Sequence, residues 1–100
     1  MVKHIILWKL KDEFTEKERL AIKMNAKREL EGLVGKIEGL EKLTVEIEGL
    51  ASSNADMMLY SEFGSAEALS AYSGNPIHCA VADCFVRPYV SVRLCLDFEA

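Results

Sequence analysis

Three side chains able to take part in chemistry stand close together in the pattern Tyr-x-x-Asn-Pro-x-His, at Tyr72, Asn75 and His78. An imidazole with its ordinary pKa of ~6.5 is the natural proton acceptor and donor at neutral pH. A tyrosine hydroxyl beside it could orient that base or donate to a developing enolate oxygen. Gly74 and Pro76 favour a turn between Tyr72 and His78, so we predict that both side chains reach the same pocket.

The same residues also fit a structural interpretation. His78 could anchor the start of a short helix to the ends of the strands, and Tyr72 could be half-buried packing. A substitution of His78 would then lower the stability and leave the ligand affinity unchanged. Both interpretations stay open on the sequence alone.

The chain around this motif alternates between strand and helix patterns. Alternating apolar residues predict strands, and a capping box at Thr15–Glu18 predicts a long helix that ends at Gly35. We expect strands over residues 2–11, 43–48, 56–63 and 89–98, and helices over 15–35, from 65 to about 72, and from about 78. This β-α-β-β-α-β order, with a short extra helix before the last strand, predicts an α+β ferredoxin-like fold. It is a four-stranded antiparallel sheet with helices on one face, formed as a single domain over residues 1–100.

The first strand predicts that both faces of the sheet are covered. Its two sets of alternating residues both contain large apolar groups, whereas a half-solvated strand shows a cleaner alternation. Helices cover one face of such a sheet, so the other face would expose an apolar patch that includes Trp8. The simplest closure is a twofold homodimer that packs the open sheet faces together, a dimeric α/β barrel with a space inside or beside it.

That space could hold a small apolar or aromatic molecule. Besides Tyr72 and His78, the residues expected to line it are His4, Ile6, Trp8, Asn75 and Arg93. The planar guanidinium group of Arg93 suits a carboxylate. Two of these residues have plainer alternatives: His4 could bond to a neighbouring strand or to the partner subunit, and Arg93 could form a surface ion pair.

The composition excludes several classes of partner. The formal net charge is −4, with Lys and Arg interspersed among Asp and Glu. The chain therefore lacks the basic stripe that binding to nucleic acid or to an anionic membrane requires. No segment approaches the ~20 apolar residues of a membrane span, and no secretory leader opens the chain, so we expect a cytoplasmic protein.

The cysteines and histidines predict neither a disulfide framework nor a cofactor. Cys79, Cys84 and Cys95 are odd in number and show no Cys-x-x-Cys spacing. We therefore expect reduced thiols that act as buried small apolar side chains. Because the His and Cys residues show no ligand spacing, we expect no metal site, and the glycines form no nucleotide-binding loop.

Two stretches resemble the stress-responsive A/B barrel (Dabb) domain family. They read V-K-H-I-I-L-W-K-L-K-D-E at the start and Y-S-G-N-P-I-H-C-A-V-A-D-C-F later in the chain, and the likeness covers essentially the whole chain. The resemblance implies a homodimeric barrel. One branch of the family, a plant polyketide cyclase, closes a linear polyketide by an intramolecular aldol reaction with a Tyr and a His in the pattern Tyr-x-x-His-Pro-x-His. Tyr72 and His78 occupy those two places, Asn75 stands at the first His, and His4 matches a pocket-lining His.

Two classes of function therefore compete. The first is a homodimeric ligand-binding protein without a reaction of its own. The second is a cofactor-free lyase or cyclase that uses Tyr72 and His78 for acid–base chemistry on a polyketide-like or aromatic substrate. Haem-using monooxygenases, which occur among related barrels, form a third option.

Overall fold

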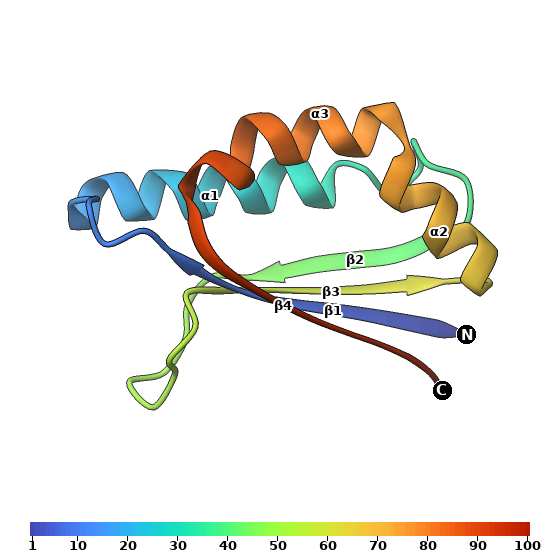
Figure 1. The fold of residues 1–100 in the computed structure, drawn as a ribbon, viewed down its shortest axis with the longest axis horizontal. Helices are drawn as coiled ribbons and strands as arrows, with labels where there is room; N and C mark the ends of the chain where they lie inside the picture. Colours follow the sequence, from blue (N-terminus) through green and yellow to red (C-terminus); the bar gives the residue numbers. More distant parts are fainter.

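The computed structural model describes residues 1–100 and contains a four-stranded antiparallel sheet with all helices on one side (Figure 1). The strands are β1 (Val2–Leu10), β2 (Leu40–Glu46), β3 (Met57–Phe63) and β4 (Val90–Glu99), in the spatial order β2-β3-β1-β4. The helices are α1 (Glu16–Glu31), α2 (Ala66–Gly74) and α3 (Pro76–Phe85), followed by a 3-10 turn, η1 (Arg87–Tyr89). The predicted ferredoxin-like order, with an extra helix before the last strand, is confirmed.

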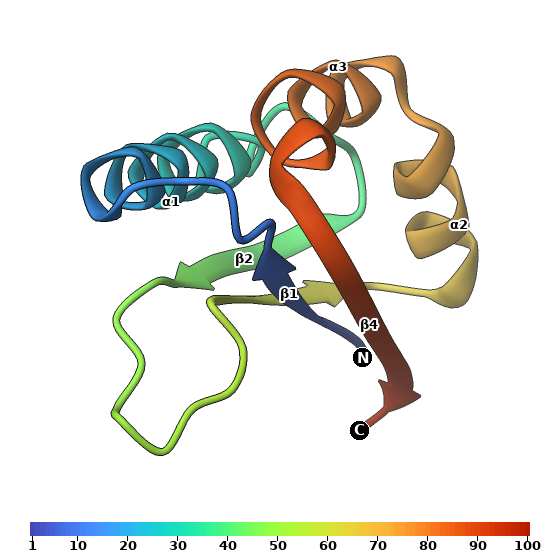
Figure 2. The same ribbon diagram turned by 60° about the vertical axis from the view of Figure 1, so that its left-hand side comes forward.

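β1 lies inside the sheet and pairs antiparallel with β3 on one side and β4 on the other. Figure 2 shows β4 running along the edge of the sheet beside β1. Successive side chains of a strand point to opposite faces. The even-numbered residues of β1, from Val2 to Leu10, are all buried. They join one apolar core with the inward residues of α1, β2 and β3.

The sequence-based assignment of Trp8 to the open face of the sheet is wrong. Its side chain is 5% exposed and lies on the same face of β1 as His4. The open face instead carries Leu7 together with Leu94 and Leu96 of β4, which are 62% and 64% exposed. Both alternating sets of β1 are apolar, so only the position of the helices decides which set is buried.

The capping box that starts α1 is confirmed. The Thr15 hydroxyl accepts a hydrogen bond from the Glu18 amide at 3.2 Å, and the Glu18 carboxylate accepts one from the Thr15 amide at 2.8 Å. The helix ends at Glu31, before the predicted stop at Gly35. Gly35, with a φ of 89°, lies instead in the turns that follow. No helix in the structure combines the length and the apolar character that crossing a membrane would need.

A sharp break separates α2 from α3, and Asn75 belongs to both helix ends. Its backbone N–H donates to the Tyr72 carbonyl at 3.1 Å and so closes the last turn of α2. Its side-chain oxygen accepts a hydrogen bond from the Ile77 amide at 2.8 Å and so caps α3. Pro76 occupies the first turn of α3, where its missing N–H needs no partner. The break thus reorients the chain within very few residues.

The prediction that the cysteines are buried is wrong. All of them are free thiols, Cys84 and Cys95 are exposed, and Cys79 is half-buried. Cys95 lies on β4, an edge strand whose residues are exposed almost throughout its length. The prediction of burial rested on residue type alone. Cys95 is exposed because an edge strand has a neighbouring strand on one side only.

Gly39 allows α2 to approach the start of β2, which generates a stability prediction. Gly39 and Gly35 both have positive φ, but a Cβ atom on Gly39 would lie 2.6 Å from the Ala68 Cβ, whereas one on Gly35 would meet nothing. Gly35→Ala should lower the free energy of unfolding by about 1–2 kcal/mol through backbone strain. Gly39→Ala should lower it by about 1–3 kcal/mol more, because the clash adds to that strain.

Urea unfolding at equal protein concentrations checks this difference. A double-mutant cycle isolates the clash. In the Ala68→Gly background, Gly39→Ala should lower the free energy of unfolding only by the cost of backbone strain, because the Ala68 Cβ atom is no longer there. Equal losses at Gly35 and Gly39 would contradict the close approach of α2 to β2.

Candidate functional site

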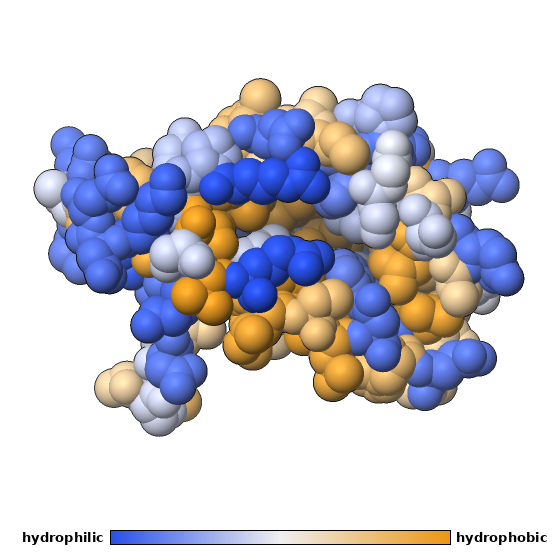
Figure 3. Space-filling model, in the orientation of Figure 1, coloured by the Kyte–Doolittle hydropathy of each residue, from blue (hydrophilic) through white to orange (hydrophobic).

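A small cavity lies between the sheet and the helices and opens beside β4. Its volume is about 70 Å³, well below the ~300–1,000 Å³ of typical pockets for whole ligands. In Figure 3 a hollow between the helices and the sheet has apolar surface within it and hydrophilic side chains on both sides. The residues that line the cavity are His4, Ile6, Trp8, Leu30, Leu59, Tyr72, Ser73, His78, Ala82, Val86, Arg87 and Arg93.

Most residues proposed from the sequence for a site come together here. β1 contributes three of them, the last turn of α2 contributes Tyr72, the first turn of α3 contributes His78, and β4 contributes Arg93. Asn75 is the exception. It does not line the cavity, because its side chain caps α3.

Tyr72 has a hydroxyl group without a partner. The side chain is 2% exposed and packs edge-on against Phe63, with ring centroids 5.0 Å apart. Its Oη atom is buried and makes no hydrogen bond. Burial raises the pKa of Tyr72 well above its usual value, although the positive charge of Arg93 opposes this. The phenol therefore stays protonated at neutral pH and is available as a donor.

His78 also has an unpartnered polar atom. Its ring lies against that of Tyr72, with centroids 4.0 Å apart and planes inclined by 34°, and its Nδ1 atom is buried without a hydrogen bond. Burial lowers the pKa of His78 below its ordinary 6.5, and the neighbouring Arg87 and His4 lower it further, although the nearby Ser73 backbone opposes this shift. The imidazole is therefore mostly neutral at pH 7 and can accept a proton.

A side-chain hydrogen bond joins His4 to Asp97 across β1 and β4. The contact joins His4 Nδ1 to a carboxylate oxygen of Asp97, and the thiol of Cys95 lies beside both groups. His4 is 5% exposed and forms part of one wall of the cavity. Burial and a hydrogen bond to Asp97 raise the pKa of the Cys95 thiol.

Sequence reasoning missed Asp97 and Arg87 as members of this region. Asp97 comes to this region because antiparallel pairing of the first and last strands sets it opposite His4. Arg87, from the turn after α3, lines the cavity and forms an ion pair with Asp83. The spacing of four residues between Asp83 and Arg87 was the only local signal for that pair.

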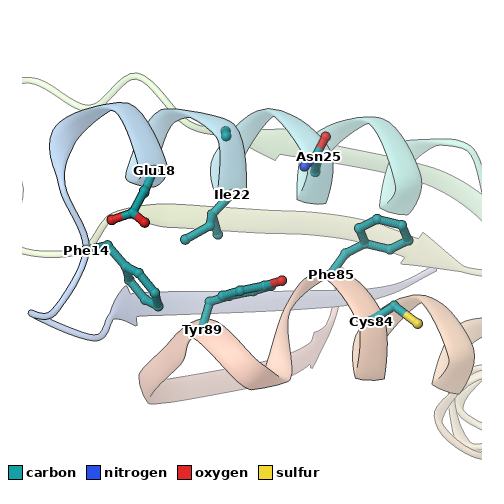
Figure 4. Close-up of a pocket in the computed structure, with 8 residues that line it drawn as sticks. Phe14, Glu18, Ile22, Asn25, Cys84, Phe85 and Tyr89 are labelled. Carbon is teal, nitrogen blue, oxygen red and sulfur yellow. The ribbon is translucent and has the colours of Figure 1, made fainter.

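A second cavity of about 310 Å³ lies between α1 and the end of α3. Figure 4 shows Phe14, Ile22 and Tyr89 turned toward one another there, and the Phe14 and Tyr89 ring centroids are 5.8 Å apart. The one carboxylate that lines this cavity, that of Glu18, already accepts the hydrogen bond from the Thr15 amide that caps α1. It contains no buried polar atom without a partner. The buried polar atoms without partners therefore belong to residues that line the smaller cavity.

The sheet order and helix arrangement define the chain as a ferredoxin-like protein with a cavity under its helices. The chain belongs to the Stress responsive A/B Barrel Domain (Dabb) family, whose model matches residues 2–100. The family assignment and the fold predicted from the sequence are thus confirmed. A search among curated proteins found no match.

Solved structures of similar proteins support this assignment. A dimeric protein of unknown function and ferredoxin-like fold from Bacteroides fragilis is 30% identical, with a TM-score of 0.92 over 99% of this chain and 95% of its own. A dimeric ferredoxin-like protein from Thermobifida fusca is 23% identical, with a TM-score of 0.79 over 99% and 90%. A Dabb family protein from Mesorhizobium loti is 20% identical, with a TM-score of 0.74 over 99% and 95%.

The lowered pKa of His78 gives a prediction with a definite sign. Between the folded-state pKa and the ordinary 6.5, the unfolded chain binds more protons than the folded chain. The contribution of neutral His78 to stability is thus present above about pH 6.5 and is lost as the pH falls through the folded pKa. NMR titration of the imidazole resonances should give His78 a midpoint below 6.5.

Charged residues around His78 provide a further test of its titration midpoint and a control. Arg87 from the turn after α3, Arg93 from β4 and His4 from β1 all act on it, and Asp83 partly neutralises Arg87. Arg87→Gln should raise the midpoint of His78, whereas Arg28→Gln, a change on the exposed side of α1, should leave it unchanged. A midpoint at or above 6.5 in the wild-type protein would contradict the burial of the ring.

Proposed function

We propose that this protein binds a small molecule whose polar head, bearing carbonyl and carboxylate oxygens, enters the cavity beside β4. The observation that carries the proposal is that two residues lining one cavity, Tyr72 and His78, each have a buried polar atom without a hydrogen bond, Oη and Nδ1 respectively. A buried polar group without a hydrogen bond costs about 1–3 kcal/mol. A ligand head group that bonds to both atoms removes that cost.

The charges and the size of the cavity specify the ligand further. Arg87 and Arg93 line the cavity, and guanidinium groups bind carboxylates with paired hydrogen bonds. Because the cavity is only about 70 Å³, it admits a head group and leaves the body of the ligand at the mouth. Apolar side chains such as Ile6 and Val86 favour an apolar or aromatic body.

We infer that the protein acts as a homodimer through the open face of its sheet. That face exposes Leu94 and Leu96 with Val92 and Phe98 along β4, an apolar row that water solvates poorly. The dimeric relatives from Bacteroides fragilis and Thermobifida fusca support the inference. The cytoplasmic location expected from the sequence stays a prediction.

Light scattering checks the homodimer. The wild-type protein at micromolar concentration should have twice the 11.2 kDa mass of the chain. Leu94→Lys should raise the dimer dissociation constant at least about 100-fold, because each subunit would bury an unpaired charge. Leu50→Lys, on the loop between β2 and β3 and 80% exposed, is the matched control and should leave the mass unchanged. A stable wild-type monomer would refute this interface.

A second candidate function, proton transfer on the bound molecule, has its own supporting observation. The two facing groups have opposite pKa shifts: His78 is kept neutral and Tyr72 is kept protonated. His78 would take a proton from the carbon next to a carbonyl group, and the Tyr72 hydroxyl would donate to the resulting enolate oxygen. Formation of this enolate is the first step of both aldol cyclisation and related lyase reactions, and it needs no cofactor.

One probe, phenylpyruvate, distinguishes the two functions, because it combines an aromatic body, a carboxylate and an enolisable ketone. Calorimetry should detect binding, and Arg93→Gln should weaken it at least about tenfold by removing a charged hydrogen bond. If the protein is also a catalyst, deuterium from solvent should enter the methylene group faster than in buffer. His78→Gln should slow that exchange roughly 10²–10⁴-fold while leaving the dimer folded.

The matched control for charge is Lys36→Gln, an exposed change between α1 and β2 that should leave binding and exchange unaltered. Binding without exchange supports the ligand-binding function and removes the catalytic one. Binding that is indifferent to both Arg93→Gln and Tyr72→Phe would show that the molecule does not use this cavity.

A further inference from the structure

Three metal-binding side chain types converge where β1 meets β4. Antiparallel pairing sets His4 opposite Asp97 and Ile6 opposite Cys95, so that these side chains share the helix-covered side of the sheet. The His4 ring nitrogen, the Cys95 sulfur and an Asp97 carboxylate oxygen all lie within 4.8 Å of one another. This cluster lies next to the cavity rather than inside it, since only His4 of the three lines the cavity.

The three donor atoms of the cluster are all in contact with one another, and only one of the two His4 ring nitrogens takes part. Cys95 Sγ lies 3.7 Å from His4 Nδ1 and 3.4 Å from Asp97 Oδ1, and the same Nδ1 atom contacts Asp97 Oδ1. A Cys-His-Asp arrangement for nucleophilic catalysis would use one ring nitrogen for the thiol and the other for the carboxylate. Mutual proximity of one nitrogen, one sulfur and one oxygen is instead the geometry of donor atoms that can surround a common central atom.

The spacing suits a tetrahedral metal ion. With a Zn–S bond of ~2.3 Å and Zn–N or Zn–O bonds of ~2.0 Å, a tetrahedral angle separates the sulfur from the other ligands by roughly 3.5 Å. The two sulfur distances of 3.7 and 3.4 Å lie on either side of this value. Only the contact between His4 and Asp97 must open, and the Asp97 side chain is 45% exposed and able to move.

The donor set selects the kind of metal. An imidazole and a thiolate are poor ligands for Mg²⁺ and Ca²⁺, which take oxygen donors, and good ligands for Zn²⁺. We propose that His4, Cys95 and Asp97 bind Zn²⁺ through one nitrogen, one sulfur and one oxygen, leaving the fourth position to water or a ligand. A tetrahedral Zn²⁺ with three protein ligands and an open position is the arrangement of catalytic zinc sites.

The surroundings provide both rigidity and access. His4 is held in place by edge-on contacts with Phe63 and Tyr72, at centroid distances of 6.2 and 6.3 Å. Cys95 and Asp97 lie on the exposed edge strand, which gives an ion an entry path. Arg93 is the neighbouring positive charge that opposes the ion, and the thiolate and carboxylate together offset the two charges of Zn²⁺.

This proposal is independent of the proposed ligand-binding function, and its test does not use a ligand. Co²⁺ serves as the probe, because in a tetrahedral site it absorbs visible light strongly and a thiolate ligand adds a charge-transfer band. Protein carrying Cys79→Ser and Cys84→Ser, freed of metal by a chelator, should bind Co²⁺ with that band and release it to Zn²⁺. Cys95→Ser in the same background should abolish the band.

The carboxylate ligand has a matched control. Asp97→Asn should weaken Co²⁺ binding at least about tenfold, whereas Asp83→Asn, a change at an exposed Asp on α3, should not weaken it. Both changes lie at exposed side chains, and circular dichroism verifies that the variants are folded. No charge-transfer band, a band that survives Cys95→Ser, or equal affinities for Asp97→Asn and Asp83→Asn would overturn the site.

Discussion

The core, the cavity wall and the open face of the sheet all depend on which face of β1 each residue occupies. This strand is flanked by β3 and β4, so its alternation is shared with both neighbours. Its even residues, including His4 and Trp8, meet the helices and form the core. Its odd residues, such as Leu7, face the open side with β4. A shift by one residue would exchange the two faces, so the same pairing fixes the core, the cavity wall and the proposed dimer surface.

The break between α2 and α3 is the second constraint, and it determines how the side chains of Tyr72 and His78 lie. Asn75 and Pro76 end one helix and start the next without a loop, which brings the rings of Tyr72 and His78 into contact. The same compact turn leaves their polar atoms buried without partners. A loop would have let water or backbone groups satisfy these atoms, so the short connection and the unpartnered atoms have one cause.

Local patterns in the sequence predicted most of the fold and part of the candidate site. The capping box at Thr15, the Asn75–Pro76 break and the alternation of apolar residues were readable because each depends on neighbours along the chain. The burial of Trp8 was not readable, since two apolar faces leave the orientation of β1 undetermined. The pairing of His4 with Asp97 was also hidden, because strand register joins residues that are 93 positions apart. For the same reason, spacing rules for metal ligands do not detect the cluster of His4, Cys95 and Asp97.

The two proposed sites meet at His4 and select opposite charges. Arg87 and Arg93 favour an anionic head group in the cavity, whereas Cys95 and Asp97 favour a cation at the edge of the sheet. Because the thiolate and the carboxylate offset the two charges of Zn²⁺, the positive potential in the cavity would still come mainly from Arg87 and Arg93. Any coupling between the two sites would pass through His4, and it must be equal in both directions. Tyr72 packs against His4 within this arrangement, and burial raises the pKa of Tyr72 and lowers that of the adjacent His78.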